Sequence, residues 1–181
     1  MSLKQPERVI GVADDNGPVW HGRSFHRDVW TMAGAEEPIG DGPVIVSKAR
    51  WLAERAHLLA RAQPVGLRLE PGEGLDDIAP DIPHFAVIAL SFPKYSDGRA
   101  FSTAALLRDK HAYRGELRAI GNVLNDQIPL MQRVGFDSFA VTHGPTRVAL
   151  SADRLAEVNL YYQPSVRQEA PAGTRPWLRR A

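Results

Sequence analysis

Short apolar runs alternate along the chain with stretches whose apolar side chains recur at helical spacing, from residue 42 onward. Ser47, which follows the apolar run at 43–46, is a typical helix N-cap, and Trp51 and Leu58 then share one face of a predicted helix. This alternation predicts strands over 43–46, 64–69, 85–90, 115–120 and 138–141, of which 43–46 and 85–90 are apolar throughout. The stretches that follow predict helices over 48–62, 75–78, from about 103 to 111, 123–134 and 151–162.

Five successive βα units predict an α/β fold with a parallel sheet, because each helix provides the crossover that a parallel pair of strands requires. A partial (βα) barrel and a doubly wound sheet both satisfy this pattern. Before these units, β-like pieces over 8–13 and 18–20 flank Asp14–Gly17, which predicts a small N-terminal β-hairpin. We therefore divide the chain into an N-terminal β extension over 1–40, a βα-repeat domain over 41–163 and a flexible basic tail over 164–181.

Two positions conflict with this simple pattern. Pro129 falls inside the predicted helix 123–134, where it removes a backbone donor, so we expect that helix to kink or to start late. Glu116 and Arg118 are two residues apart in a predicted strand and therefore point to the same face. Because buried charges must be paired, either that face opens into a cavity or the two side chains have partners elsewhere in the chain.

Composition removes several classes of function. The 181 residues contain 22 Lys and Arg against 21 Asp and Glu, so no basic field predicts a nucleic-acid or membrane partner. The absence of cysteine excludes disulfides, thiolate nucleophiles and thiolate metal sites. Neither an H-E-x-x-H pair nor a Gly-rich phosphate loop is present, so no metal or nucleotide site is predicted. No apolar run approaches the ~20 residues of a membrane span, and we expect a cytoplasmic protein.

Polar side chains are dense just beyond the carboxyl ends of the third and fourth predicted strands. In parallel α/β proteins ligands bind at that edge of the sheet, where loops and helix N-termini converge. Turn formation and helix capping explain any one of these residues equally well. We nevertheless expect one site there that includes the two charges of the fourth strand. The candidate catalytic residues are Asp97, Glu116 and Asp126, and the candidate ligand-binding residues are Arg99, Arg118, Asn122 and Gln127.

At these same residues the chain resembles the bacterial family catalogued as domain of unknown function 934. The resemblance extends over about residues 40–163 and rests on the segments Leu90–Arg99, Leu106–Arg108, Tyr113–Gly121 and Arg133–Asp137. Members are described as oxidoreductases of sulfite reduction, typically encoded beside assimilatory sulfite reductase. This chain has Asn122 where members usually have Asp, and Val134 where Cys is frequent, which argues against a thiol redox mechanism.

Three hypotheses for the function follow. The first is an accessory protein of assimilatory sulfur metabolism that acts with sulfite reductase and has an anion-binding pocket at the carboxyl edge of the sheet. The second is a small-molecule enzyme or anion-binding protein in which Arg99 and Arg118 hold the ligand while Asp97, Glu116 or Asp126 transfers protons. The third is a non-catalytic assembly factor. The residues indicate no cofactor, and the basic tail is expected, if ordered, to pack against a second copy of the chain.

Overall fold

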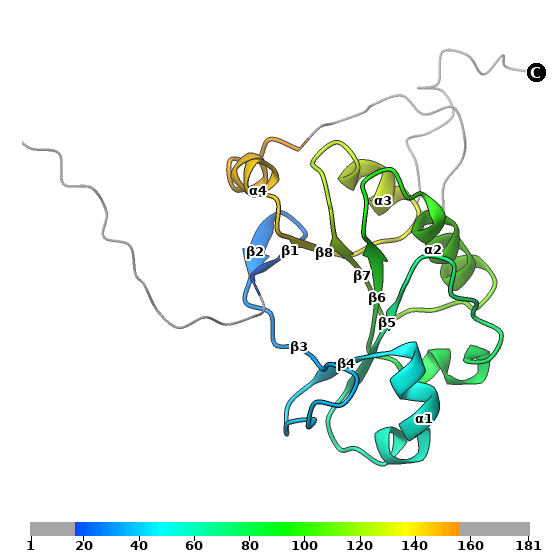
Figure 1. Ribbon diagram of the computed structural model, residues 1–181. Helices are drawn as coiled ribbons and strands as arrows, with labels where there is room; N and C mark the ends of the chain where they lie inside the picture. The colour runs from blue at the N-terminus through cyan, green and yellow to red at the C-terminus, as the bar shows by residue number, and fades with distance from the viewer. Residues whose placement is uncertain (1–16, 156–181) are drawn as a thin grey trace, which may run out of the picture.

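Five parallel strands lie side by side in the sheet in the order in which they occur in the chain. The structure is a computed structural model that describes residues 17–155. The five strands are β4 (Val44–Ser47), β5 (Val65–Leu69), β6 (Val87–Phe92), β7 (Glu116–Gly121) and β8 (Ser138–Val141). Because consecutive strands are neighbours, right-handed crossovers return on the same side each time. The helices therefore line one face, and the sheet curls into a half-barrel (Figure 1). The barrel-like alternative, rather than the doubly wound sheet, describes this part of the fold.

The complete sheet has eight strands and is mixed, which corrects the expectation of a purely parallel sheet. Strands β1 (Val19–His21) and β2 (Ser24–His26) form an antiparallel hairpin, and β1 joins the sheet by pairing antiparallel with β8. The short β3 (Thr31–Met32) pairs parallel with β4 at the opposite edge. The hairpin turns at Gly22, whose φ of 67° suits glycine. A hairpin is therefore present over 19–26, whereas the predicted strand over 8–13 and most of the turn that follows it lie outside the described residues.

The helices follow the predicted order with shifted ends. They are α1 (Lys48–Leu59), the 3₁₀ helix η1 (Ala79–His84), α2 (Arg99–Asp109), α3 (Ile128–Arg133) and α4 (Gly144–Ser151). Helix α3 starts late and has Pro129 in its first turn, where the missing N–H is not needed, as predicted. The short helix predicted over 75–78 is instead η1. Helix α4 comes directly after β8 rather than at 151–162, and most of that predicted helix lies outside the described residues.

Apolar side chains pack on both faces of the half-barrel. The larger core lies between the sheet and the helices and includes Leu117 and Ala119 of β7. On the concave face, Trp30 from the segment between β2 and β3 packs with a smaller group that includes Ile45 and Ile120. Strand β7 therefore alternates its side chains between the two cores, with Arg118 and Ile120 on the concave face.

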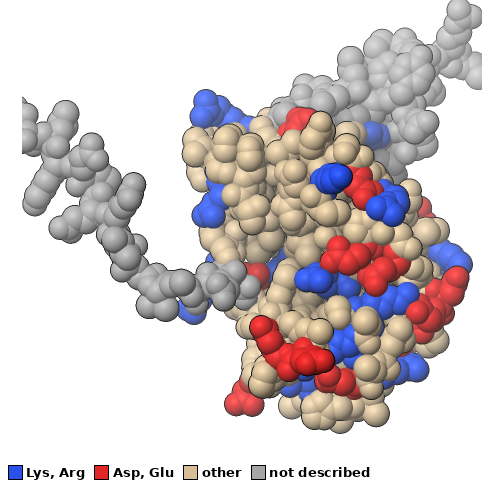
Figure 2. All heavy atoms as spheres, in the orientation of Figure 1, with Lys and Arg blue, Asp and Glu red and all other residues tan. Residues whose placement is uncertain are grey.

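Charged side chains of both signs are interspersed on the face of the molecule that Figure 2 shows. This distribution agrees with the near-neutral net charge of +1. Among residues 17–155, no helix combines the length and the apolar character that crossing a bilayer requires. The predicted basic tail over 164–181 lies outside the described residues.

Candidate functional site

The predicted site residues lie toward opposite ends of β7. Asn122, Asp126 and Gln127 follow its carboxyl end, whereas Glu116 is its first residue. At a rise of about 3.3 Å per residue, the first and last residues of a six-residue strand are roughly 16 Å apart. The structure therefore separates these side chains into two groups and does not bring them into one site.

At the carboxyl edge, Asp97 and Arg99 form an exposed ion pair where α2 begins. The Asp97 carboxylate accepts hydrogen bonds from Nε and Nη2 of Arg99 at 3.0 and 2.7 Å and from its backbone N–H at 3.2 Å. The side-chain hydrogen bonds from Arg99 lower the pKa of Asp97 below its usual value. The charge of Arg99 is therefore already balanced within its own loop.

The other predicted residues of this edge differ in their surroundings. The side-chain amide of Gln127 donates to the carbonyl oxygen of Tyr95 at 2.6 Å, which ties the loop after β7 to the loop after β6. Asn122 and Asp126 are exposed, and their side chains make no hydrogen bond to another residue within 17–155. The edge is thus polar and ordered by contacts between its loops.

Arg118 lies on the concave face and is only 4% exposed. Its Nε and Nη2 lie 2.9 and 2.8 Å from Oε1 of Glu116, so the pair predicted from the strand period forms. A third member, Asp28, accepts a hydrogen bond from Nη1 of Arg118 at 2.7 Å. Asp28 precedes Arg118 by 90 residues, and no local pattern in the sequence connects them. Two carboxylates therefore balance one buried guanidinium.

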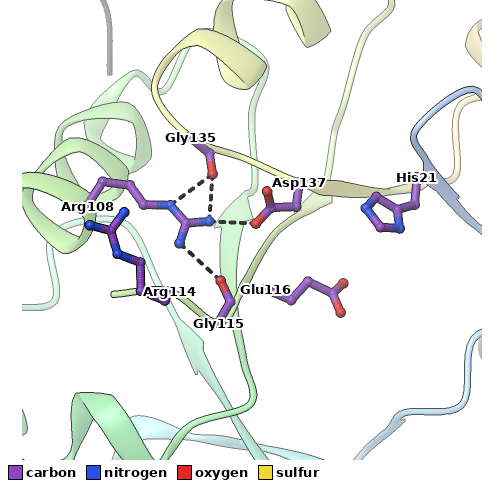
Figure 3. Close-up of a pocket in the computed structure, with 7 residues that line it drawn as sticks. All are labelled: His21, Arg108, Arg114, Gly115, Glu116, Gly135 and Asp137. Atoms are coloured by element: carbon purple, nitrogen blue, oxygen red, sulfur yellow. Dashed lines mark hydrogen bonds and ion pairs between the residues drawn. The ribbon is translucent and has the colours of Figure 1, made fainter. Parts of the chain in front are cut away.

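A cavity of about 460 Å³ opens at the amino ends of β7 and β8, near Glu116 (Figure 3). This volume lies within the range of small-molecule sites. The cavity lies at the edge of the sheet opposite to the one that the sequence predicts. It is lined by five polar or charged side chains and two glycines: His21, Arg108, Arg114, Glu116, Asp137, Gly115 and Gly135.

Arg108, near the end of α2, holds the floor of this cavity together. Its Nη1 donates to the carbonyl oxygens of Tyr113 and Gly115 at 2.6 and 3.0 Å, and its Nε and Nη2 donate to that of Gly135 at 3.1 and 2.8 Å. Nη2 also donates to the Asp137 carboxylate. All five N–H groups of this guanidinium are thus used within the protein. Burial raises the pKa of the adjacent Tyr113 above its usual value.

Arg114 lies between Tyr113 and Gly115, two of the three residues whose carbonyl groups Arg108 binds. Its own side chain is exposed, lines the cavity and makes no hydrogen bond or ion pair within residues 17–155 (Figure 3). The backbone on both sides of Arg114 is therefore held in place by Arg108. The guanidinium of Arg114 lines the cavity with N–H donors that no residue within 17–155 uses. The segment Tyr113–Gly121, which carries the family resemblance, was the available signal for this residue.

Glu116 and His21 lie at the other side of the cavity from Arg114 (Figure 3). Oε1 of Glu116 accepts from Arg118 and from the hydroxyl group of Ser138. Oε2 accepts no hydrogen bond from the described residues. His21 is exposed and lies opposite Ser138 in the pairing of β1 with β8. Sequence reasoning found Glu116 but missed His21, because the pairing of β1 with β8 was not predicted.

In the described part of the chain, no three His, Asp or Glu side chains lie close enough together to bind a metal ion. The polar groups that the cavity offers are one guanidinium, one carboxylate oxygen and one imidazole. Such groups hold small charged molecules through charge-assisted hydrogen bonds.

Comparison with known proteins gives one match. A search of the curated proteins and a search of the solved structures each found no match. The model of a family described as a bacterial protein of unknown function, DUF934, matches residues 66–173, which is more than half of the chain. These residues include most of β5, all of β6 to β8 and every residue of the cavity except His21. The chain therefore belongs to the DUF934 family of bacterial proteins of unknown function.

Proposed function

We propose that this protein is an accessory protein of assimilatory sulfur metabolism that acts beside sulfite reductase and binds a small oxyanion without transforming it. The metabolic setting is supported by the resemblance described in the sequence analysis, to a family whose members are described as typically encoded beside assimilatory sulfite reductase. The cavity at the amino ends of β7 and β8 supports the binding of a small molecule.

Arg114 is the observation that carries the proposed oxyanion binding. Arg99 is paired with Asp97, and Arg118 is paired with Glu116 and Asp28. Arg114 has no such partner within residues 17–155 and lines the cavity. A guanidinium presents planar donors that match two oxygens of a sulfite, sulfate or carboxylate group. The anion is therefore expected at Arg114 and not at the carboxyl edge.

The surroundings of the three candidate catalytic carboxylates, Asp97, Glu116 and Asp126, favour a binding protein over an enzyme that transfers protons. Hydrogen bonds from Arg99 lower the pKa of Asp97, and a carboxylate with a lowered pKa is a weak general base at neutral pH. One oxygen of Glu116 is occupied by Arg118 and Ser138. Asp126 is exposed and lies at the opposite end of β7 from the cavity.

Thermal unfolding with and without sulfite, sulfate and acetate tests this proposal. A ligand stabilises only the state that binds it, so a concentration of 100 Kd should raise the Tm of the wild type by roughly 5 to 10 °C. Arg114→Gln should abolish this rise. Arg99→Gln is the control, since it removes another exposed guanidinium, at the other edge of the sheet.

The possible results separate an anion site at Arg114 from one at the carboxyl edge and from a non-catalytic assembly factor. A response lost in Arg99→Gln and kept in Arg114→Gln would return the anion site to the carboxyl edge. A wild type whose Tm responds to none of the three anions contradicts oxyanion binding and favours the assembly factor. Co-purification of the full chain with sulfite reductase from a strain that produces both then tests the partner.

A further inference from the structure

The cavity has polar groups of opposite charge on its two sides. Figure 3 shows Arg114 beside Arg108 on one side, and Glu116 and His21 on the other. The bound Arg108–Asp137 pair and the glycine backbone lie between them. A single oxyanion bound by Arg114 would leave the side with Glu116 unfilled.

Glu116 has one oxygen bound by other side chains and one that accepts no hydrogen bond from the described residues. Arg118 and Ser138 both donate to Oε1, which fixes the carboxylate on the strand. The side chain is 30% exposed, and Oε2 accepts no hydrogen bond within residues 17–155. A carboxylate oxygen accepts only, so its best ligand is a positively charged donor such as an ammonium group.

We propose that the cavity binds an amphoteric ligand of short-peptide size, with its acid group at Arg114 and its ammonium group at Glu116. This inference rests on the proposed function, because Arg114 is the same anion-binding residue. The volume of about 460 Å³ is much larger than one oxyanion needs and suits a ligand that spans both sides. His21 lies beside Glu116 and provides a further hydrogen-bonding group for the amino end of the ligand.

Three peptides that differ only at their ends test the inference on the unmodified protein. Triglycine has both charges, N-acetyl-triglycine lacks the ammonium group, and triglycine amide lacks the carboxylate. The apparent Kd is obtained from Tm against peptide concentration, with sulfite measured in parallel. Each blocked peptide should bind roughly tenfold or more weakly than triglycine, since each loses one charge-assisted contact. Arg114→Gln should bind triglycine and triglycine amide equally.

This design avoids a substitution at Glu116, which would also disturb the buried Arg118. If N-acetyl-triglycine binds as well as triglycine, or triglycine does not bind while sulfite does, the amphoteric ligand is excluded and the oxyanion site remains. If neither sulfite nor any peptide raises the Tm, the proposed function fails together with the inference.

Discussion

Arg118 shows how a charge is accommodated on an otherwise apolar face. Its guanidinium is buried, and its partners come from its own strand and from a residue far earlier in the chain. Removing one member of a buried ion pair leaves the others without compensation, and this is usually more harmful than replacing the whole group. Arg118 therefore has a structural role in this protein.

Arg118→Met should destabilise the fold by about 3 to 5 kcal/mol, because Glu116 and Asp28 keep their charges without a cationic partner. Arg68→Met is the control. Arg68 faces the same side of the sheet two strands away, but its ion pair with Glu70 is 42% and 45% exposed, so its loss should change stability by about 1 kcal/mol or less. Urea unfolding of both variants measures the difference. Equal stability of the two variants would contradict the structural role of Arg118.

Among the secondary-structure elements, the connection between α3 and β8 shapes the cavity, because Gly135 in this connection packs against Arg108. Gly135 has a φ of 104°, which favours glycine, and a Cβ atom built there would lie 2.7 Å from Cγ of Arg108. Gly135, which connects α3 to β8, thus lies against Arg108 near the end of α2. The Arg108 guanidinium then fixes the carbonyl groups on both sides of Arg114.

Gly135→Ala should destabilise the protein by about 1 to 3 kcal/mol through backbone strain, and displacement of Arg108 should also weaken the anion response. Gly144→Ala provides the control, since nothing lies within 4 Å of the added methyl group at the start of α4. Chemical denaturation and the sulfite-induced change in Tm are measured on both. A Gly135→Ala protein with wild-type stability would show that this contact is relaxed at little cost.

The sequence predicted the parallel strands well because each is a short segment rich in apolar residues that precedes a stretch of helical spacing, even though β7 also contains Glu116 and Arg118. The alternation of side chains also predicted that Glu116 and Arg118 share a face. The pairing of distant segments could not be predicted from the sequence, because no local pattern relates β1 to β8 or Asp28 to Arg118. The cavity was missed for a related reason. Its shape depends on Arg108 drawing together backbone groups from separate turns, at the edge that general rules for α/β proteins do not favour.

At the scale of the whole molecule, the segment between β2 and β3 covers part of the concave face. Trp30 is 8% exposed and packs with residues from β4, β6 and β7, including Ile45 and Ile120. Asp28, two residues earlier, forms the ion pair with Arg118. One short segment therefore fills part of the half-barrel with an aromatic ring and a charge.

Trp30→Ala should lower stability by about 3 to 5 kcal/mol, since it removes the largest side chain of the concave core. The variant should also bind a fluorescent hydrophobic dye more strongly than the wild type, because Ile45 and Ile120 lose their cover. Val29→Ala changes a neighbour that is 65% exposed and should leave both measurements nearly unchanged. Equal dye binding by the wild type and Trp30→Ala would mean that other residues seal this face.

The pairing of β1 with β8 has a consequence for biosynthesis. A ribosome releases Val19–His21 early, but the strand that receives them, Ser138–Val141, emerges more than a hundred residues later. At ~5–20 residues per second, the first hairpin waits about 6 to 24 s for its place in the sheet. The consecutive βα units can form in order during that time, because their contacts are local. The earliest described strand to be translated is therefore among the last to be incorporated, and nascent chains that end before Ser138 should leave it accessible to chaperones and proteases.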